Sequence, residues 1–127
     1  MSKLVIYHHT CPDGFASALV IHKKFPEGVD YFPGVYQKDP PDVKGKDVIM
    51  VDFCYKRPVM EQILRDANSL IWIDHHKSAI EDMEGLDIPG SRALNQSGCT
   101  LTWNYFFPYL SLPKLLQYIE DIDLWKF

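Results

Sequence analysis

The chain has 127 residues, enough for one domain with a substantial core, and apolar and charged fractions of 46% and 24% exclude a disordered or fibrous protein. A formal net charge of −4 argues against nucleic-acid binding through bulk charge, although it leaves room for a local basic groove. Three widely spaced cysteines predict no disulfide framework, and with neither a membrane span nor a secretory signal in the sequence we expect a cytoplasmic protein.

The first predicted unit is a strand followed by a helix. The apolar strand Lys3–Tyr7 ends in His8 and His9, and a tight turn follows over residues 10–14. Residues 15–24 are rich in helix formers. Their helical spacing predicts an apolar face made of Phe15, Ala18, Leu19 and His22. A strand, a polar turn and a helix in this order begin a βαβ unit.

The pattern continues through the middle of the chain. A short strand is expected at residues 29–32, followed by a loop over residues 37–46 that contains two adjacent prolines. The buried strand Val48–Val51 ends in Asp52, and Pro58 suits the first position of the next helix. That helix has an apolar stripe made of Met60, Ile63, Leu64 and Ala67.

The strand Leu70–Ile73 runs directly into Asp74, His75 and His76. A short apolar run of this kind is typical of a strand buried on both faces. Ionisable groups directly after it are hard to explain by packing. We therefore treat this segment as the part of the chain around which a functional site is organised.

The C-terminal third contains shorter elements. We expect a helix capped by Ser78, a turn at residues 85–90, a strand at residues 91–95, a helix after Gly98 and another opened by Pro113. The last two helices are expected to bury Cys99, Trp103, Phe106 and Phe107, and Leu115, Leu116, Ile119 and Ile122. The whole chain, residues 1–127, then forms one α/β domain of three α/β/α layers, with a mostly parallel sheet of about five strands.

Metal-ligand residue types follow three of the predicted strands. Because parallel strands end at the same edge of a sheet, we expect His9, Asp13, Asp52 and His75 to converge on one crevice. Imidazoles mixed with carboxylates suit manganese, iron, cobalt or zinc. Taken alone, Asp52 would equally be a helix cap and Asp13 a turn residue, and we assign no role to His8 or His22.

On these residues the chain resembles the DHH phosphoesterases, a family of nucleases, cyclic-dinucleotide phosphodiesterases, pyrophosphatases and polyphosphatases. The triplet that names the family stands here as Asp74-His75-His76. The other motifs match in order as the turn His9–Gly14, the strand ending in Asp52, and Asp121 on a late segment. The resemblance spans nearly the whole chain.

The resemblance implies a metal-dependent phosphohydrolase. Asp52 would bridge two divalent ions, with His9 and Asp13 on one of them and His75 and Asp121 on the other. The ions would be Mn²⁺ first, with Zn²⁺, Co²⁺ or Mg²⁺ as alternatives. A metal-bound hydroxide would attack phosphorus, with Asp52 and His76 as the catalytic residues. The expected partner is a phosphorylated small molecule, a nucleotide or a short single-stranded oligonucleotide, not a membrane.

Two departures from the family pattern bear on this interpretation. Cys11 and Phe15 stand where the family has a second acid, so the Cys11 thiolate or Asp123 would have to substitute, and a thiolate would favour zinc. The family's smaller C-terminal domain does not follow the fourth motif. The apolar tail made of Leu124, Trp125 and Phe127 predicts either a surface left by that domain or the contact of a homodimer.

Other residues are weaker candidates for contacts with a substrate. Lys56, Arg57 and Lys77 are candidate phosphate contacts, although exposed cations are usually only solvated. The aromatic residues Tyr31, Phe32 and Tyr36 are candidates for stacking on bases, although strand aromatics are more often buried. The alternative functions are a catalytically impaired nucleotide- or phosphate-binding module that retains the fold, and a purely structural metal site.

Overall fold

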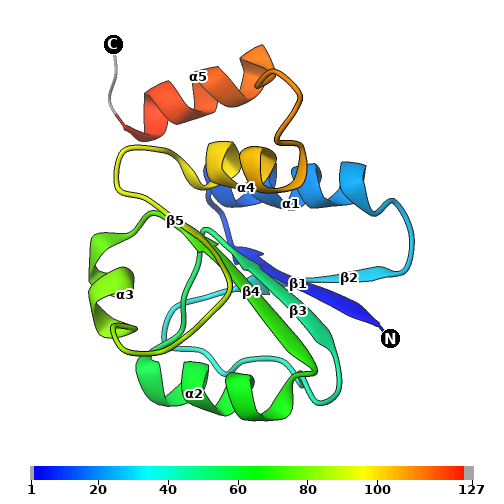
Figure 1. The fold of residues 1–127 in the computed structure, drawn as a ribbon, viewed down its shortest axis with the longest axis vertical. Coiled ribbons are helices and arrows are strands. Elements are labelled where there is room, and N and C mark those ends of the chain that lie inside the picture. Colours follow the sequence, from blue (N-terminus) through cyan, green and yellow to red (C-terminus); the bar gives the residue numbers. More distant parts are fainter. Residues whose placement is uncertain (1, 125–127) are drawn as a thin grey trace.

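A computed structural model describes residues 2–124 and contains one five-stranded sheet with helices on both faces (Figure 1). Along the chain the elements are β1 (Lys3–His8), α1 (Pro12–Lys24), β2 (Val29–Gly34), β3 (Asp47–Val51), α2 (Arg57–Asp66), β4 (Ser69–Asp74), α3 (Lys77–Asp82), β5 (Gly90–Arg92), α4 (Gly98–Phe106) and α5 (Lys114–Asp123). All neighbouring strands are parallel, in the order β2-β1-β3-β4-β5. The predicted α/β class is confirmed.

The helices form a layer on each face of the sheet. In Figure 1, α1 and α4 cover one face and α5 lies outside them, while α2 and α3 cover the other face. β2 lies on one side of β1, whereas β3, β4 and β5 lie on the other side of β1. The strand order therefore reverses at β1, and the crevice between the ends of β1 and β3 is where sheets of this kind bind ligands.

The central strands β1, β3 and β4 are buried on both faces, which explains why they are continuous apolar runs. Successive side chains of a strand point to opposite faces. One face contributes Val5, Ile49, Val51 and Ile73 to a cluster with Ile21 of α1 and Leu101 of α4. The other contributes Ile6, Met50 and Trp72 to a cluster with Met60 and Ile63 of α2. This core holds the carboxyl ends of the strands in fixed positions.

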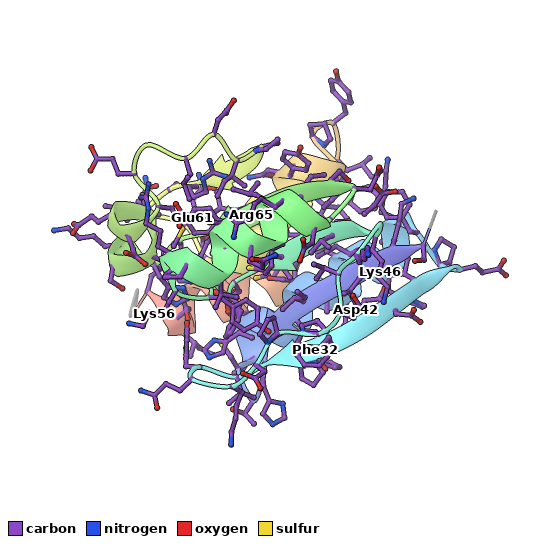
Figure 2. All side chains as sticks on the ribbon, turned by 90° about the horizontal axis from the view of Figure 1, so that it is seen from below. Phe32, Asp42, Lys46, Lys56, Glu61 and Arg65 are labelled. Carbon is purple, nitrogen blue, oxygen red and sulfur yellow. The ribbon has the colours of Figure 1, made fainter. Side chains whose placement is uncertain are left out.

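Figure 2 views the molecule from the side of α2. It shows Glu61 and Arg65 along this helix and Phe32 on β2, while Asp42 and Lys46 lie on the connection from β2 to β3. The predicted helix after Asp52 is confirmed, with Pro58 in its first turn and Met60 and Ile63 buried. Among the described residues, no helix is long and apolar enough to cross a membrane.

The predicted apolar face of α1 is wrong except at Ala18, which is buried. The helix begins at Pro12, so the expected turn over residues 10–14 is partly its first turn, and Phe15 and Leu19 are 58% and 48% exposed. The buried face contains smaller residues, including Ala16 and Val20, which pack with Cys99 and Trp103 of α4 and Leu116 of α5. Small side chains permit close approach of α1 and α4, whereas Phe15 and Leu19 remain outside and Ile21 packs on the sheet.

Three further expectations about the C-terminal third need correction. In α5 only Leu116 is fully buried, whereas Leu115 and Ile122 are exposed, because the helix packs on α4 and α1 by one side alone. The N-cap of α3 is His76 rather than Ser78. β5 contains only three residues and ends at Arg92. The predicted contact of the apolar tail lies mostly outside the described residues, in 125–127.

Candidate metal centre

Three neighbouring strands end with ionisable side chains at the same edge of the sheet. His8 ends β1, Asp74 ends β4, and Asp52 follows β3 directly. The three strands lie side by side in the order β1-β3-β4, so these side chains lie around the reversal of strand order. Asp13 and His75 join them from the segments that follow β1 and β4.

Asp52 lies at the middle of the cluster and is completely buried. Its backbone has a φ of 54°, a left-handed conformation that is uncommon for residues other than glycine and stores strain. Its N–H donates to Ile73 O at 2.9 Å. Gly98 lies against it so closely that a Cβ atom there would be 2.8 Å from Asp52 Cβ. Asp52 is therefore positioned by its neighbours on both sides.

Asp13 connects the start of α1 to the start of α4. Its Oδ2 accepts from Gly98 N and its Oδ1 from Cys99 N, both at 2.8 Å. Burial opposes ionisation, but hydrogen bonds from His75, Cys99 and Gly98 outweigh it and lower the pKa of Asp13 to about 2. This carboxylate is thus charged and fixed by the N-terminal amides of α4, where the helix dipole favours a negative charge.

His75 lies between three carboxylates. Its Nε2 is 2.9 Å from Asp52 Oδ1, 3.2 Å from Asp13 Oδ2 and 3.5 Å from Asp123 Oδ2. Burial alone would lower the pKa of His75, but hydrogen bonds to Asp13 and Asp52 raise it to about 10. The imidazolium therefore supplies one positive charge at the point where the carboxylates converge, and a divalent ion would have to compete with its proton.

His76 forms a pair with Asp74. His76 Nδ1 donates to Asp74 Oδ1 at 2.6 Å, and this hydrogen bond, opposed by burial, raises the pKa of His76. Its side chain is 36% exposed, whereas Asp74 is completely buried. His75 and His76 do not point to opposite sides as neighbouring strand residues would. Their ring centroids are 4.4 Å apart, because β4 ends at Asp74 and strand alternation ends with it.

His8 and Cys11 face the other oxygen of Asp52. His8 Nδ1 is 3.8 Å from Asp52 Oδ2, and Cys11 Sγ donates to the same oxygen at 3.4 Å. Burial and the nearby Asp52 outweigh hydrogen bonds from the backbone and raise the pKa of the Cys11 thiol to about 11. Without an ion, Cys11 is therefore a protonated thiol.

The residues present fit one or more divalent ions. Donor atoms lie within 4.8 Å of one another in three groups: His8, Cys11 and Asp52; Asp13, His75 and Asp123; and Asp52, Asp74, His75 and His76. Two buried atoms at the centre, His8 Nδ1 and Asp74 Oδ2, have no hydrogen-bond partner in the described part of the chain. Buried polar atoms are normally satisfied, so these two are available to a ligand.

The structure brings together Asp13, Asp52 and His75, as the sequence predicted, but differs at two positions. His9 is exposed and its N–H donates to Gly34 O, and neither His9 nor Asp121 belongs to the three groups. His8 and Asp123 lie there instead. β1 extends to His8, so His9 already lies beyond the strand, and residues two apart on a helix point to different sides.

Two of the candidate phosphate contacts, Arg57 and Lys77, already have partners within the protein. Arg57 donates to Asp82 O and Glu84 O and pairs with Glu61, which ties it to α3 and α2. Lys77 pairs with Glu81 at 3.8 Å on α3. His22 is exposed on α1.

Comparison with known proteins adds relatives without a stated activity. No family model matches the chain. An uncharacterized protein of Acanthamoeba polyphaga mimivirus is 36% identical over 98% of this chain, which spans 34% of that protein. The crystal structure of an uncharacterized protein from Helicobacter pylori G27 has a TM-score of 0.75 at 17% identity, and the match covers 98% of this chain and 44% of that one. The chain therefore spans about a third of the viral relative, and the second likeness shows the fold alone.

Proposed function

We propose that the chain is the catalytic domain of a metal-dependent phosphohydrolase of the DHH phosphoesterase type. The observation that carries the proposal is the convergence of Asp13, Asp52 and His75 at the reversal of strand order, with Asp52 shared by two donor groups. A carboxylate shared in this way is suited to bridge two ions. Two such ions about 3.5–4 Å apart are a recurrent device for in-line displacement at phosphorus.

The donor groups suggest how two ions would be held. Asp13, His75 and Asp123 would hold one ion, and His8, Cys11 and Asp52 would hold the other. Asp52 would also reach the first ion, because its Oδ1 lies 2.9 Å from His75 Nε2. Bound ions of this kind lower the pKa of a coordinated water and neutralise charge on the phosphate. The protein contributes fixed carboxylates whose geometry is imposed by β3 and by the start of α4.

His76 is the residue proposed to act on the substrate. It lies beside the cluster, is partly exposed, and its Nδ1–H is held by Asp74. That hydrogen bond leaves Nε2 directed away from Asp74, and it keeps the ring in one orientation. From this position His76 would protonate the leaving oxygen or bind the phosphate.

We also place the protein in a reducing, cytoplasmic compartment, because all three cysteines are free.

The test is hydrolysis of bis-p-nitrophenyl phosphate by the purified protein with and without manganese. We expect release of nitrophenol that depends on manganese and stops when a chelator is added. Manganese binding without turnover would favour a phosphate-binding module that has lost catalysis. Circular dichroism would show whether the protein unfolds when a chelator removes the metal. Unfolding would favour a structural metal site, because removal of metal from a catalytic centre should leave the fold largely intact.

Cys11 predicts a preference for a softer ion at one of the two sites. We expect cobalt-loaded protein to show a thiolate-to-cobalt charge-transfer band that is lost in Cys11→Asp, since thiolate ligands select zinc and cobalt over manganese and magnesium. Cys11→Asp should shift the preference toward manganese. Cys54→Ala is the matched control, because Cys54 is buried outside the three groups. A band that persists without Cys11 would show that the thiol is not a ligand.

A further inference from the structure

Tyr36 is an aromatic residue next to the candidate metal centre. It follows β2 in the chain, and its ring meets His8 edge-on with centroids 5.1 Å apart. His8 in turn lies 6.3 Å from His76, ring to ring. Burial, followed by the negative charges of Asp74 and Asp52, raises the pKa of Tyr36 to about 12, so the phenol is neutral beside the carboxylates.

The ring of Tyr36 is supported from beneath. Phe53, which is completely buried, stacks on it with centroids 4.9 Å apart and planes inclined by 28°. Phe53 is itself held edge-on by Tyr55 at 4.8 Å. Gly34 lies over the Phe53 ring, where a Cβ atom would come within 2.8 Å of Phe53 Cε2. Tyr36 is therefore the outer member of a fixed set of three rings.

Half of Tyr36 remains exposed. The following residue, Gln37, has a φ of 67°, a left-handed conformation at the point where the chain turns away from the ring. The two other aromatic candidates lie elsewhere: Tyr31 contacts His22 of α1, and Phe32 packs against the core. Of the three, Tyr36 alone adjoins the metal centre.

We infer that Tyr36 stacks on the base of a nucleotide whose phosphate lies at the metal centre. An exposed ring backed by a buried one suits the flat face of a base, and such stacking tolerates any base. The inference rests on the proposed function and narrows its substrate to a base-bearing phosphoester, such as a short single-stranded oligonucleotide, in preference to inorganic polyphosphate or pyrophosphate. The net negative charge of the chain fits a ligand that is bound through stacking and metal ions rather than through many cations.

The experiment compares a dinucleotide with the same molecule lacking one base. We measure kcat/KM with manganese for a diadenylate and for its two abasic analogues, using the wild type, Tyr36→Leu and Tyr36→Phe. Removing one of the bases should cost the wild type about tenfold in kcat/KM, chiefly through KM, as expected for loss of one stacked base. Tyr36→Phe should keep this preference, and Tyr36→Leu, which still covers Phe53, should lose it.

The control is Tyr31→Leu on β2, the strand that precedes Tyr36, and this variant should keep the wild-type preference. Equal preference for the base in the wild type and in Tyr36→Leu would overturn the inference, and so would a wild type indifferent to base removal. Absence of turnover with every substrate would instead count against the proposed function. Dissociation constants of the diadenylate and its two abasic analogues are then measured for the wild type and the variants. Tyr36→Leu must again lose the preference for the base.

Discussion

Asp52→Asn is expected to abolish binding of both ions while the domain remains folded. Oδ1 of Asp52 faces His75, and Oδ2 faces His8 and Cys11, so one carboxylate serves both sides of the centre. Asparagine has nearly the same shape but no charge and only one oxygen, so it fills the same space without bridging. Metal content of the purified variant by mass spectrometry should fall to background, and circular dichroism should match the wild type.

A matched control lies at the other end of the same strand. Asp47 begins β3, and its Oδ1 accepts from Asn68 Nδ2 and Ser69 Oγ, far from the cluster. Asp47→Asn should keep full metal content, so a loss restricted to Asp52→Asn would identify the centre. If Asp52→Asn retained both ions and full turnover, the bridging assignment would be wrong.

His76→Ala is expected to lower kcat by about 10²–10⁴-fold on a dinucleotide, the usual contribution of a positioned acid or base. On bis-p-nitrophenyl phosphate the loss should be much smaller, because nitrophenolate is a weakly basic leaving group that departs without a proton. The measurement is kcat for both substrates with manganese, in the wild type and the variant. Metal content should change little, because Asp52 and His75 remain.

The contrast between the two substrates separates the two roles considered for His76. An equal loss on both would mean that His76 binds the phosphate instead of protonating the leaving oxygen. His22→Ala is the control for removal of an imidazole, because His22 is exposed on α1 and should leave both rates unchanged. Unchanged rates in His76→Ala itself would remove this residue from the proposed machinery.

The centre of the sheet could be predicted because β1, β3 and β4 are buried on both faces. Runs such as Val48–Val51 and Leu70–Ile73 are apolar throughout, and the structure confirms strands at both. The faces of the helices were harder to predict. α1 packs on α4 and α5 through small residues such as Ala16, and a hydrophobicity pattern gives more weight to Phe15 and Leu19, which are exposed. Size, not polarity, decides that contact.

The site could be predicted to the level of strand ends but not of single residues. Asp13, Asp52 and His75 converge, whereas the choice between His8 and His9 depends on where β1 ends. No residue pattern predicts that point to within one position. The backbone amides of Gly98 and Cys99 were missed entirely, because every residue except proline has an N–H. The small size of Gly98 against Asp52 is the one sequence signal for that contact.

The hydrogen bonds that Gly98 N and Cys99 N donate to Asp13 join residues that are 85 and 86 positions apart. During synthesis on the ribosome, the segment with His8, Cys11, Asp52 and the Asp74–His76 triplet is complete long before these amides emerge. A nascent chain at that stage has metal-ligand side chains but nothing to fix Asp13 against them. If the proposed centre binds metal, selection of the ion would therefore fall to the finished domain, and the unfinished chain would hold ions loosely enough to exchange them.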